Sequence, residues 1–432
     1  MSSKSSTRLG VRDAARGGPT RFGVAVLSGL LRRGRVSLAA AASLSVAAFG
    51  YAACTEKSKP ADVADADQRR ELLANLGEHV LLTTYRDFAG RAEGLERALN
   101  AYAEALDDET RNAAQAALRD ALLSWERAEV YQVGPAADVT NFNPGARGLR
   151  AEIYAWQDAN PCAVDRGLVN GMHESDDFEG DVYAYARDLS AIERLLFDGS
   201  TATACAASDR VVTPAAWQAL VESDLTQRRA RFAVRAGAVV REKADALVSE
   251  FEHEFLPQLA QAGAGSKLFD RTQEALNALT NALFYLDYDV RDMKLGGPLG
   301  HTMACSNVAC PTELPHSKLS KRAVRENLLA FRAVFQGHLP DAAAPDSTLA
   351  GLNDLLASVG AQQLADEIDA AVTEALEAVD AVEPDFEAAS RAEGGELARA
   401  FDALQALADL LKTEFLQKLA LNEPMRASGD ND

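Results

Sequence analysis

The chain has 432 residues, of which 47% are hydrophobic, and it carries 44 Lys and Arg against 64 Asp and Glu. This apolar content is enough for a large core and excludes a chain that is disordered throughout. The formal net charge of −20 argues against a nucleic-acid-binding protein, which needs a basic face against the phosphates. Since the first 53 residues contribute +7, the remainder carries −27, which suits a soluble envelope protein or a protein that handles cations.

The N-terminal segment has the composition of an export signal. An apolar, alanine-rich run over residues 38–53 follows the basic cluster Arg32-Arg33-Gly34-Arg35. This order of basic and apolar regions predicts a signal peptide over residues 1–53, and the run is too short to favour a permanent membrane span. The run ends at Cys54 in a pattern that resembles a bacterial lipobox, which predicts lipidation there; ordinary cleavage at the end of the run is the alternative.

A polar tether is expected over residues 54–66, between the signal peptide and the folded body. Thr55 after the lipidated cysteine is compatible with sorting to the outer membrane. The sequence therefore predicts an exported protein with a lipid anchor in the envelope membrane, on the periplasmic face of the outer membrane. Nucleic acid is not expected as a partner.

Export makes the remaining cysteines interpretable as disulfides. Cys162, Cys205, Cys305 and Cys310 are an even number in an oxidising compartment and allow three pairings. We favour Cys305–Cys310, which closes a short loop, and Cys162–Cys205, which joins the flanks of one insertion. A metal site is the weaker alternative, because no CxxC or paired-histidine spacing accompanies these residues.

The body has helical periodicity throughout. Apolar residues spaced by three, four and seven begin in the segment 76–102 and continue in seven further segments, which are rich in Ala, Leu, Glu and Arg. These segments are 110–131, 181–198, 214–256, 267–293, 320–337, 360–384 and 394–419. Because no long alternating β-branched stretch occurs, we expect an all-α protein.

Turn residues divide the helices into two sets. Gly and Pro clusters predict breaks at 143–145, 160–161, 198–199, 263–265, 296–298 and 339–345. Thr213 and Asp346 precede predicted helix starts, and Pro257 should kink or end the long helix before it. Four principal helices precede residue 262 and four follow it, which predicts two packed four-helix bundles over 67–262 and 263–425, with a disordered tail over 426–432.

Three helices each place one acidic residue within or beside an apolar stripe. With a step of about 100° per residue, Glu129 and Glu193 fall inside their stripes, Asp287 lies on a border, and Ser190 lies at an edge. A buried carboxylate is unfavourable unless it is matched, so these positions need an explanation. By the same phase, Glu126 and Asp289 are expected on solvated faces.

Two explanations of the inward acids remain open. In the first, the three acids converge on a bound cation or act as acid/base groups with shifted pKa values. Alternatively, each makes a structural pair with an inward arginine, such as Arg127 or Arg150.

Familiar catalytic motifs are missing from the sequence. No HExxH or GxSxG occurs, and the glycines over 296–300 are not followed by the lysine of a phosphate-binding loop. Among six histidines, His316 is the best candidate for a metal ligand, because it lies in a loop that enters a helix. His253 lies between two glutamates on a predicted surface.

Four stretches in order together resemble the imelysin family of iron-regulated envelope proteins. They are Trp125–Pro135, Asp188–Gly199, Lys294–Gly300 and Glu313–Asn327. The resemblance covers roughly residues 70–422 and implies two pseudo-symmetric four-helix bundles with a site in the cleft between them. It also implies a link to iron or haem acquisition, iron- or haem-uptake proteins as possible partners, and the family's historical designation as a metallopeptidase.

The sequence departs from the family's GxHxxE motif at two positions. Asp188 stands at its Gly and Ser190 at its His, whereas Glu193 is retained. A neutral serine hydroxyl is a poor zinc ligand, which argues against peptidase action through this motif.

Three hypotheses of function follow. The first is a non-catalytic envelope lipoprotein that binds iron, another cation or a metal-bearing partner through the cleft. The second is a metallopeptidase that uses Glu193, with His316 as a further ligand; the third is a scaffold whose cleft contacts another envelope protein. The expected cleft residues are Glu129, Ser190, Glu193, Asp287, His316 and Ser317. Of these, Glu129, Glu193 and Asp287 are the expected oxygen ligands of a hard cation such as Fe³⁺ or Ca²⁺.

Overall fold

The computed structural model describes residues 65–141, 143–302, 305, 310–340, 350–390 and 395–424. The described residues form helices and connecting segments without a β-strand, which confirms the all-α prediction. The predicted signal peptide, the Cys54 lipidation site, nearly all of the tether, the Asp346 helix start and the C-terminal tail lie outside these residues.

The α-helices of the first half of the chain are α1 (Ala66–Asn75), α2 (Thr83–Ala105), α3 (Asp108–Ala128), α4 (Leu149–Ile153), α5 (Pro161–Val169), α6 (Phe178–Asp181), α7 (Leu189–Phe197), α8 (Pro214–Ser223), α9 (Leu225–Glu250) and α10 (Leu256–Ala260). Those of the second half are α11 (Thr272–Leu283), α12 (Gly297–Leu299), α13 (Ser320–Gln336), α14 (Leu352–Ser358), α15 (Gln362–Asp380), α16 (Phe386–Ala389), α17 (Glu396–Leu410) and α18 (Leu416–Lys418).

Shorter or wider helical segments join these helices. Among the described residues, the π-helical segments are η1 (Leu76–Leu82), η7 (Phe251–Phe255), η8 (Leu286–Gly296) and η9 (Leu411–Phe415). The single 3₁₀ turns in the described ranges are η2 (Gly134–Ala136), η3 (Val139–Asn141), η4 (Trp156–Asp158), η5 (Met172–Glu174) and η6 (Ala184–Ala186).

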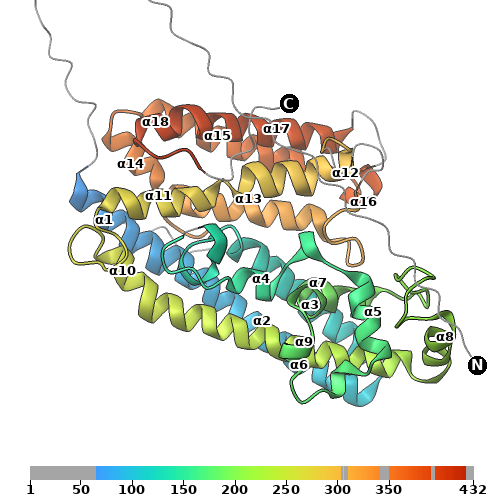
Figure 1. The fold of residues 1–432 in the computed structure, drawn as a ribbon. Helices are drawn as coiled ribbons and strands as arrows, with labels where there is room; N and C mark the ends of the chain where they lie inside the picture. The colour runs from blue at the N-terminus through green and yellow to red at the C-terminus, as the bar shows by residue number, and fades with distance from the viewer. Residues whose placement is uncertain are drawn as a thin grey trace, which may run out of the picture. The chain divides into compact units, whose positions relative to one another are not determined.

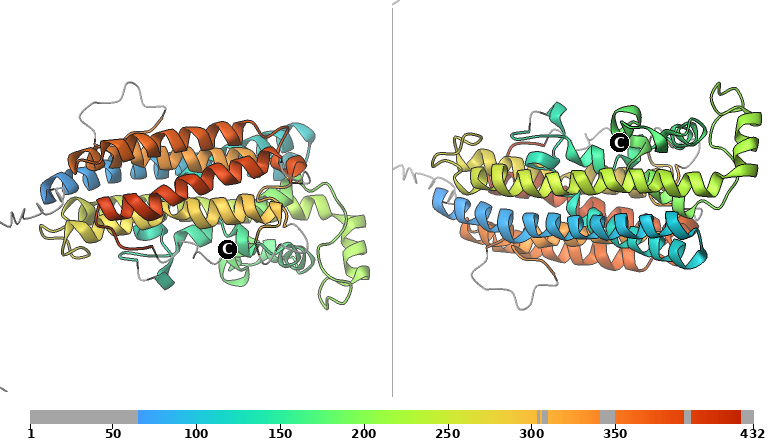
Figure 2. Two further views of the ribbon diagram at one scale, coloured as in Figure 1. Left: turned by 90° about the horizontal axis from the view of Figure 1, so that it is seen from above. Right: turned by 90° about the horizontal axis from the view of Figure 1, so that it is seen from below.

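The principal helices form two rings of four with the same pattern of neighbours. In the first, α2, α3, α7 and α9 each contact the next, and α9 closes the ring on α2. In the second, η8, α13, α15 and α17 do the same, and α17 closes on η8. Figures 1 and 2 show α2 beside α9 and α15 beside α17. The second helices of the two rings, α3 and α13, contact each other, so the arrangement is that of two packed four-helix bundles.

Several predicted boundaries hold for local chemical reasons. Thr213 caps α8 by accepting a hydrogen bond from the Ala216 N–H. Pro257 lies in the first turn of α10, directly after the π-helical η7; since proline has no N–H, regular helical hydrogen bonding is interrupted there. The predicted division at residue 262 stays a prediction, although a turn connects α10 with α11 at that point.

The predicted continuous helix over 181–198 is wrong. Only α7 is a regular helix in that segment, and it begins after Asp188, whose backbone is extended. The Asp188 carboxylate accepts hydrogen bonds from the N–H groups of Ala191, at 3.0 Å, and Ala155, at 2.7 Å. A buried aspartate that caps a helix thus interrupts an otherwise continuous apolar periodicity.

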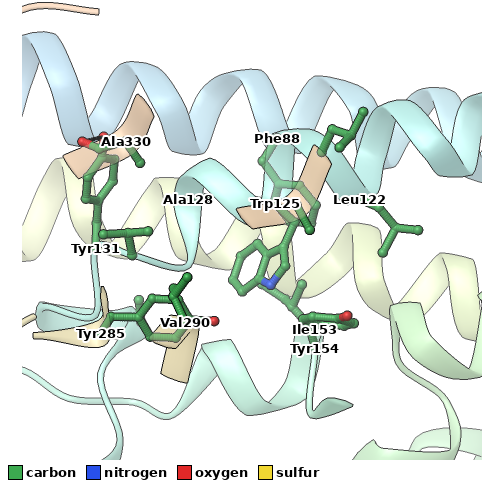
Figure 3. Packing of buried hydrophobic residues seen from close by; sticks show 14 of the residues in the cluster. Phe88, Leu122, Trp125, Ala128, Tyr131, Ile153, Tyr154, Tyr285, Val290 and Ala330 are labelled. Carbon is green, nitrogen blue, oxygen red and sulfur yellow. Dashed lines mark hydrogen bonds between the residues drawn. The ribbon is translucent and has the colours of Figure 1, made fainter. Parts of the chain in front are cut away.

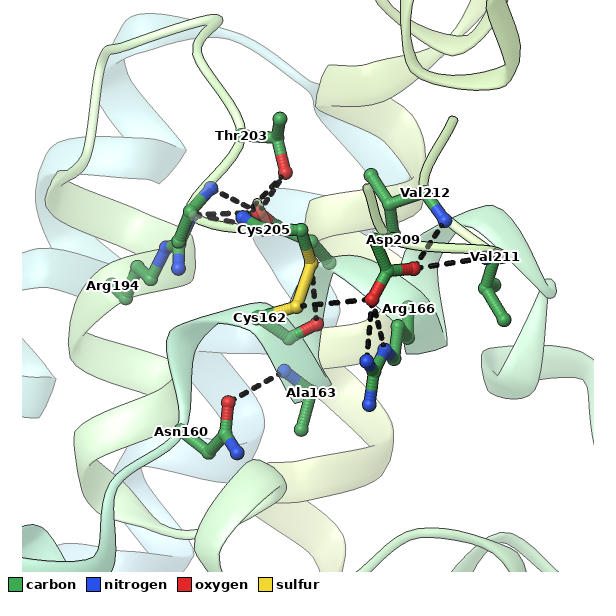
Figure 4. Close-up of a disulfide and its surroundings, with 12 residues drawn as sticks. Asn160, Cys162, Ala163, Arg166, Arg194, Thr203, Cys205, Asp209, Val211 and Val212 are labelled. Atoms are coloured by element: carbon green, nitrogen blue, oxygen red, sulfur yellow. Dashed lines mark hydrogen bonds and ion pairs between the residues drawn. A yellow bond between two sulfur atoms is a disulfide. The ribbon is translucent and has the colours of Figure 1, made fainter. Parts of the chain in front are cut away.

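Both predicted disulfides are present. Cys162–Cys205 ties α5 to the segment before α8, and Cys305–Cys310 closes a short loop after α12. Asp209 lies against the first disulfide and pairs with Arg166 (Figure 4). The two sulfur atoms are bonded to each other, so this group of Cys162, Cys205 and Asp209 is a cross-link and offers no thiolate to a metal.

Candidate functional site

A fully buried lysine lies at the centre of an acidic cluster between the two bundles. Lys294 Nζ of η8 is 2.6 Å from Glu126 Oε2, 2.6 Å from Glu129 Oε1 and 3.0 Å from Glu313 Oε1. It also donates a hydrogen bond to Asn327 Oδ1 of α13 at 3.0 Å. One ammonium group therefore joins the end of α3, the end of η8, α13 and the loop before α13.

Two tyrosines and an asparagine complete the cluster. The Tyr285 hydroxyl donates to Glu129, and the Tyr154 hydroxyl donates to Glu313 at 3.1 Å. The Asn327 amide donates to the Glu126 backbone carbonyl at 2.6 Å and to its side chain at 3.1 Å. Figure 3 shows Tyr154 and Tyr285 in the packed interior beside Trp125, so apolar side chains border the polar cluster.

The carboxyl groups of the cluster differ in their ionisation. Burial raises the pKa of Glu126 well above its usual range and the pKa of Glu313 to about 7, although Lys294 opposes both effects. At Glu129, the charges of Lys294 and Arg150 outweigh burial and lower the pKa. Burial disfavours the charged form of Lys294, but the three acids together raise its pKa well above the usual value. The lysine is therefore an ammonium ion beside at least one ionised carboxylate.

Each of the three acids keeps one oxygen without a hydrogen-bond partner among the described residues. These atoms are Glu126 Oε1, Glu129 Oε2 and Glu313 Oε2. Buried polar atoms normally have a partner, so the cluster has free capacity for a proton, a water molecule or a ligand group. Three carboxyls around one ammonium cannot all be charged at low cost, which agrees with the raised pKa values of Glu126 and Glu313.

A pocket of about 380 Å³ adjoins this cluster through Glu313. It lies between α5 and α7 on one side and Gly297, Cys305 and the residues from Cys310 to His316 on the other, so both halves of the chain contribute. Its polar lining includes Ser190, Glu193, Glu313 and His316. Aromatic and aliphatic side chains make much of the remaining wall, among them Trp156 and Tyr185.

Glu193 is the most isolated acid of this pocket. It is 2% exposed, and its Oε1 accepts hydrogen bonds from the backbone N–H and the hydroxyl of Ser317, both at 2.7 Å. Burial raises its pKa to about 7 against the opposing effect of the Ser317 hydrogen bonds. Among the described residues it has no salt bridge, because the neighbouring Arg194 pairs with Asp165 at 2.9 Å. A cation in the pocket would supply the missing positive charge.

His316 and Ser190 line the same pocket in different ways. The His316 side chain is reached by solvent, yet partial desolvation lowers the pKa of its imidazole, which favours the neutral form that metals require. The Ser190 hydroxyl donates to Asp188 Oδ1 at 2.7 Å. Ser190 thus supports the helix cap of α7 while it forms part of the pocket wall.

The three acids expected to form one cation site do not share a cluster among the described residues. Glu129 belongs to the Lys294 cluster, and Glu193 lines the pocket. Asp287 lies 3.0 Å from both Arg291 and Lys412, as in the structural-pair alternative. The acids whose carboxylates lie close together are Glu126, Glu129 and Glu313.

Two predictions of solvated acids are wrong. Glu126 is 0% exposed and Asp289 is 1% exposed. Glu126 is buried because α3 packs against α13 as well as within its own bundle, so a second face of this helix is covered. Asp289 lies in π-helical η8, whose wider turn does not follow a 100° step.

Sequence reasoning missed Lys294 and Glu313 as site residues. Lys294 lies in π-helical η8, where a 100° step does not report which face is buried. Glu313 lies in a loop, where no periodicity reports burial.

Within the described residues, no helix has the length and apolar character needed to cross a bilayer.

Comparison with known proteins agrees with this architecture. The Imelysin family model (Peptidase_M75) matches residues 81–413, and the chain therefore belongs to the imelysin family. No curated protein matches the chain.

Two solved structures share the fold at low sequence identity. One is a putative iron-regulated protein A precursor from Parabacteroides distasonis ATCC 8503, with a TM-score of 0.64 and 14% identity over 81% of this chain and 94% of that one. The other is an imelysin-like protein from Psychrobacter arcticum 273-4, with a TM-score of 0.62 and 12% identity over 84% of this chain and 98% of that one.

Proposed function

We propose that this imelysin-family protein is a non-catalytic envelope lipoprotein that binds a cation, with iron as the first candidate, in the pocket between its two bundles. The observation that carries this proposal is Glu193, a buried carboxyl that lines the pocket without a salt bridge among the described residues. Such a group is unfavourable in its charged form unless a cation approaches it.

The residues of the pocket suit an intermediate or hard metal ion. Glu193 and Glu313 offer carboxylate oxygens, and His316 offers an imidazole nitrogen. Carboxylate and imidazole ligands together suit iron and manganese better than soft metals. The description of the Parabacteroides relative as iron-regulated supports iron as the cargo.

Export and lipid anchoring belong to the same proposal. The N-terminal sequence carries a signal-peptide pattern that ends at Cys54. The two disulfides are what an oxidising compartment allows. A lipid anchor would hold the pocket at the periplasmic face of the outer membrane, where iron- or haem-uptake proteins are candidate partners.

Equilibrium dialysis tests the binding. The purified chain from residue 55 to 432 is dialysed against Fe²⁺ without oxygen and, separately, against ferric iron in organic chelates. The proposal predicts saturable binding in at least one form, weakened at least tenfold in Glu193→Gln. Unchanged binding in the variant, or no binding in any form, would contradict it.

A metallopeptidase is the second candidate, since Glu193 and His316 share the pocket and the family model carries a peptidase name. A neutral Ser190 at the motif's histidine position is a poor ligand for zinc, which disfavours this function. Peptide cleavage that stops on addition of a chelator and in Glu193→Gln would establish it in place of simple binding.

A further inference from the structure

The pocket is larger than a hydrated ion needs. A cation with six water molecules fills about 180 Å³ if each water takes about 30 Å³. The cavity is about 380 Å³, within the range of pockets that bury small organic molecules. The excess volume is therefore space for an organic group.

The walls of the pocket are also unlike those of a site for a bare ion. Trp156, Tyr185, Pro161, Val164 and Met293 contribute apolar surface. Sites for hard metal ions surround the ion with oxygen ligands and water, and such water loses hydrogen bonds against apolar walls. A mostly apolar wall with a few placed polar groups is the usual lining of a pocket for an organic ligand.

An aromatic surface continues from the pocket to the solvent. Tyr185 lines the pocket and stacks on Tyr183, with ring centroids 5.3 Å apart and an angle of 15° between the planes. Tyr183 is 71% exposed, although most large apolar side chains of the described residues are buried. The two rings form a platform on which a ligand larger than the cavity could rest its outer part.

The polar groups indicate the charge of such a ligand. Glu193 has no salt bridge among the described residues, and the guanidinium of Arg194 is engaged by Asp165 and Asp198. The Trp156 indole N–H, Arg194 Nη1 and Glu313 Oε2 also lack a hydrogen-bond partner there, although these three atoms are themselves buried. With a chain net charge of −20, a ligand of negative charge would be repelled.

From these features we infer that the pocket takes its cation as part of an organic metal chelate of neutral or positive net charge, not as a hydrated ion. The apolar part of the chelate lies against Trp156 and Tyr185, and its positive part faces Glu193 and Glu313. This inference rests on the proposed function, because it names the form in which the cation binds.

Calorimetric titration of residues 55–432 tests the inference with four probes. They are hydrated Fe²⁺ without oxygen, ferric citrate as an anionic chelate, a ferric trihydroxamate that bears a free ammonium group, and the same trihydroxamate without metal. We expect the ferric trihydroxamate to bind at least tenfold more tightly than the other three.

Single substitutions distinguish the contribution of the aromatic wall to binding from the contribution of the acids. Tyr185→Ala should weaken binding of the ferric trihydroxamate about tenfold, and Glu193→Gln should weaken it at least as much. Tyr288→Ala removes a 41% exposed tyrosine that does not line the pocket and should change nothing. Circular dichroism of each variant checks that it is folded.

The outcomes distinguish this inference from the proposed function. Tight, Glu193-dependent binding of hydrated Fe²⁺ with no preference for the chelate would overturn the inference and leave cation binding intact. Preference for ferric citrate would overturn the assignment of charge. Equal binding of the metal-free trihydroxamate would overturn the inference, because it would show an organic-ligand site without a role for the metal. Absence of binding by every probe would overturn both proposals.

Discussion

Lys294 and Glu313 connect the buried interior of the protein with its pocket. The Lys294 ammonium lies 3.0 Å from Glu313 Oε1, while Glu313 also lines the cavity that contains Glu193. The side chains of both residues are 1% exposed. The orientation of a pocket carboxyl that lies in a loop is therefore fixed by a lysine of η8 that does not itself line the cavity.

Replacement of Lys294 by methionine should destabilise the protein by about 3–5 kcal/mol, because it leaves Glu126, Glu129 and Glu313 buried without their shared cation. Urea unfolding measures the loss. The deficit should shrink as the pH falls from 8 to 5, since protonated carboxyls need no counter-charge. Lys418→Met, at an exposed position, is the control. Equal stability of the two variants would show that the cluster is not a matched ionic unit.

Glu193 should make stability depend on pH near neutrality. Its pKa in the folded protein is raised from 4.5 to about 7, so the folded state binds the proton more tightly than the unfolded state. Its contribution to stability is full below about pH 4.5 and is lost as the pH rises through about 7, by up to about 3 kcal/mol. Glu193→Gln should flatten this part of the profile. An identical pH profile in the variant and the parent would contradict the raised pKa.

Asp188 should be important for the stability of α7. Its carboxylate caps the helix at Ala191 and also accepts the buried N–H of Ala155, so Asp188→Ala leaves more than one donor unsatisfied. We expect a loss of about 2 kcal/mol in thermal or urea unfolding. Asp107→Ala, at the exposed cap of α3, should lose about 1 kcal/mol. A larger loss at Asp107 than at Asp188 would contradict this account.

The two disulfides should differ in their contribution to stability. Cys162 and Cys205 are 43 residues apart, and Cys305 and Cys310 are 5 apart. Loop-closure entropy predicts a loss of about 4 kcal/mol when the first pair is replaced by alanine and about 2 kcal/mol for the second. Urea unfolding of the two double variants compares them. Because Cys305 and Cys310 line the pocket, their double variant should also weaken ligand binding. A larger loss of stability for the Cys305 and Cys310 variant than for the Cys162 and Cys205 variant would contradict the prediction.

The fold was largely predictable because its helices have long amphipathic stretches. The periodic segments at 110–131, 320–337 and 360–384 match α3, α13 and α15 within a few residues. The segment at 181–198 fails because apolar spacing continues through a 3₁₀ turn and a capping aspartate. Both disulfide pairings followed from sequence separation and the position of the insertion.

The site was only partly predictable, and the reasons are physical. Glu129 and Glu193 interrupt apolar stripes, and the structure shows both buried. Helix phase reports which face is covered but not which residues from other helices meet there, so Glu129, Glu193 and Asp287 were grouped although each has different neighbours. Glu313 and His316 lie outside any regular helix, where phase carries no information.

Metal content is the most direct test of cation binding in the pocket. The chain from residue 55 to 432 is incubated with Zn, Mn, Cu, Ca and both hydrated and chelated Fe, desalted, and analysed by mass spectrometry for metals. Glu193→Gln and the exposed control Glu104→Gln are treated in parallel. The account predicts near-stoichiometric iron in the parent and in Glu104→Gln, and its loss in Glu193→Gln. Absence of retained metal from the parent, or equal retention in all three, would contradict it.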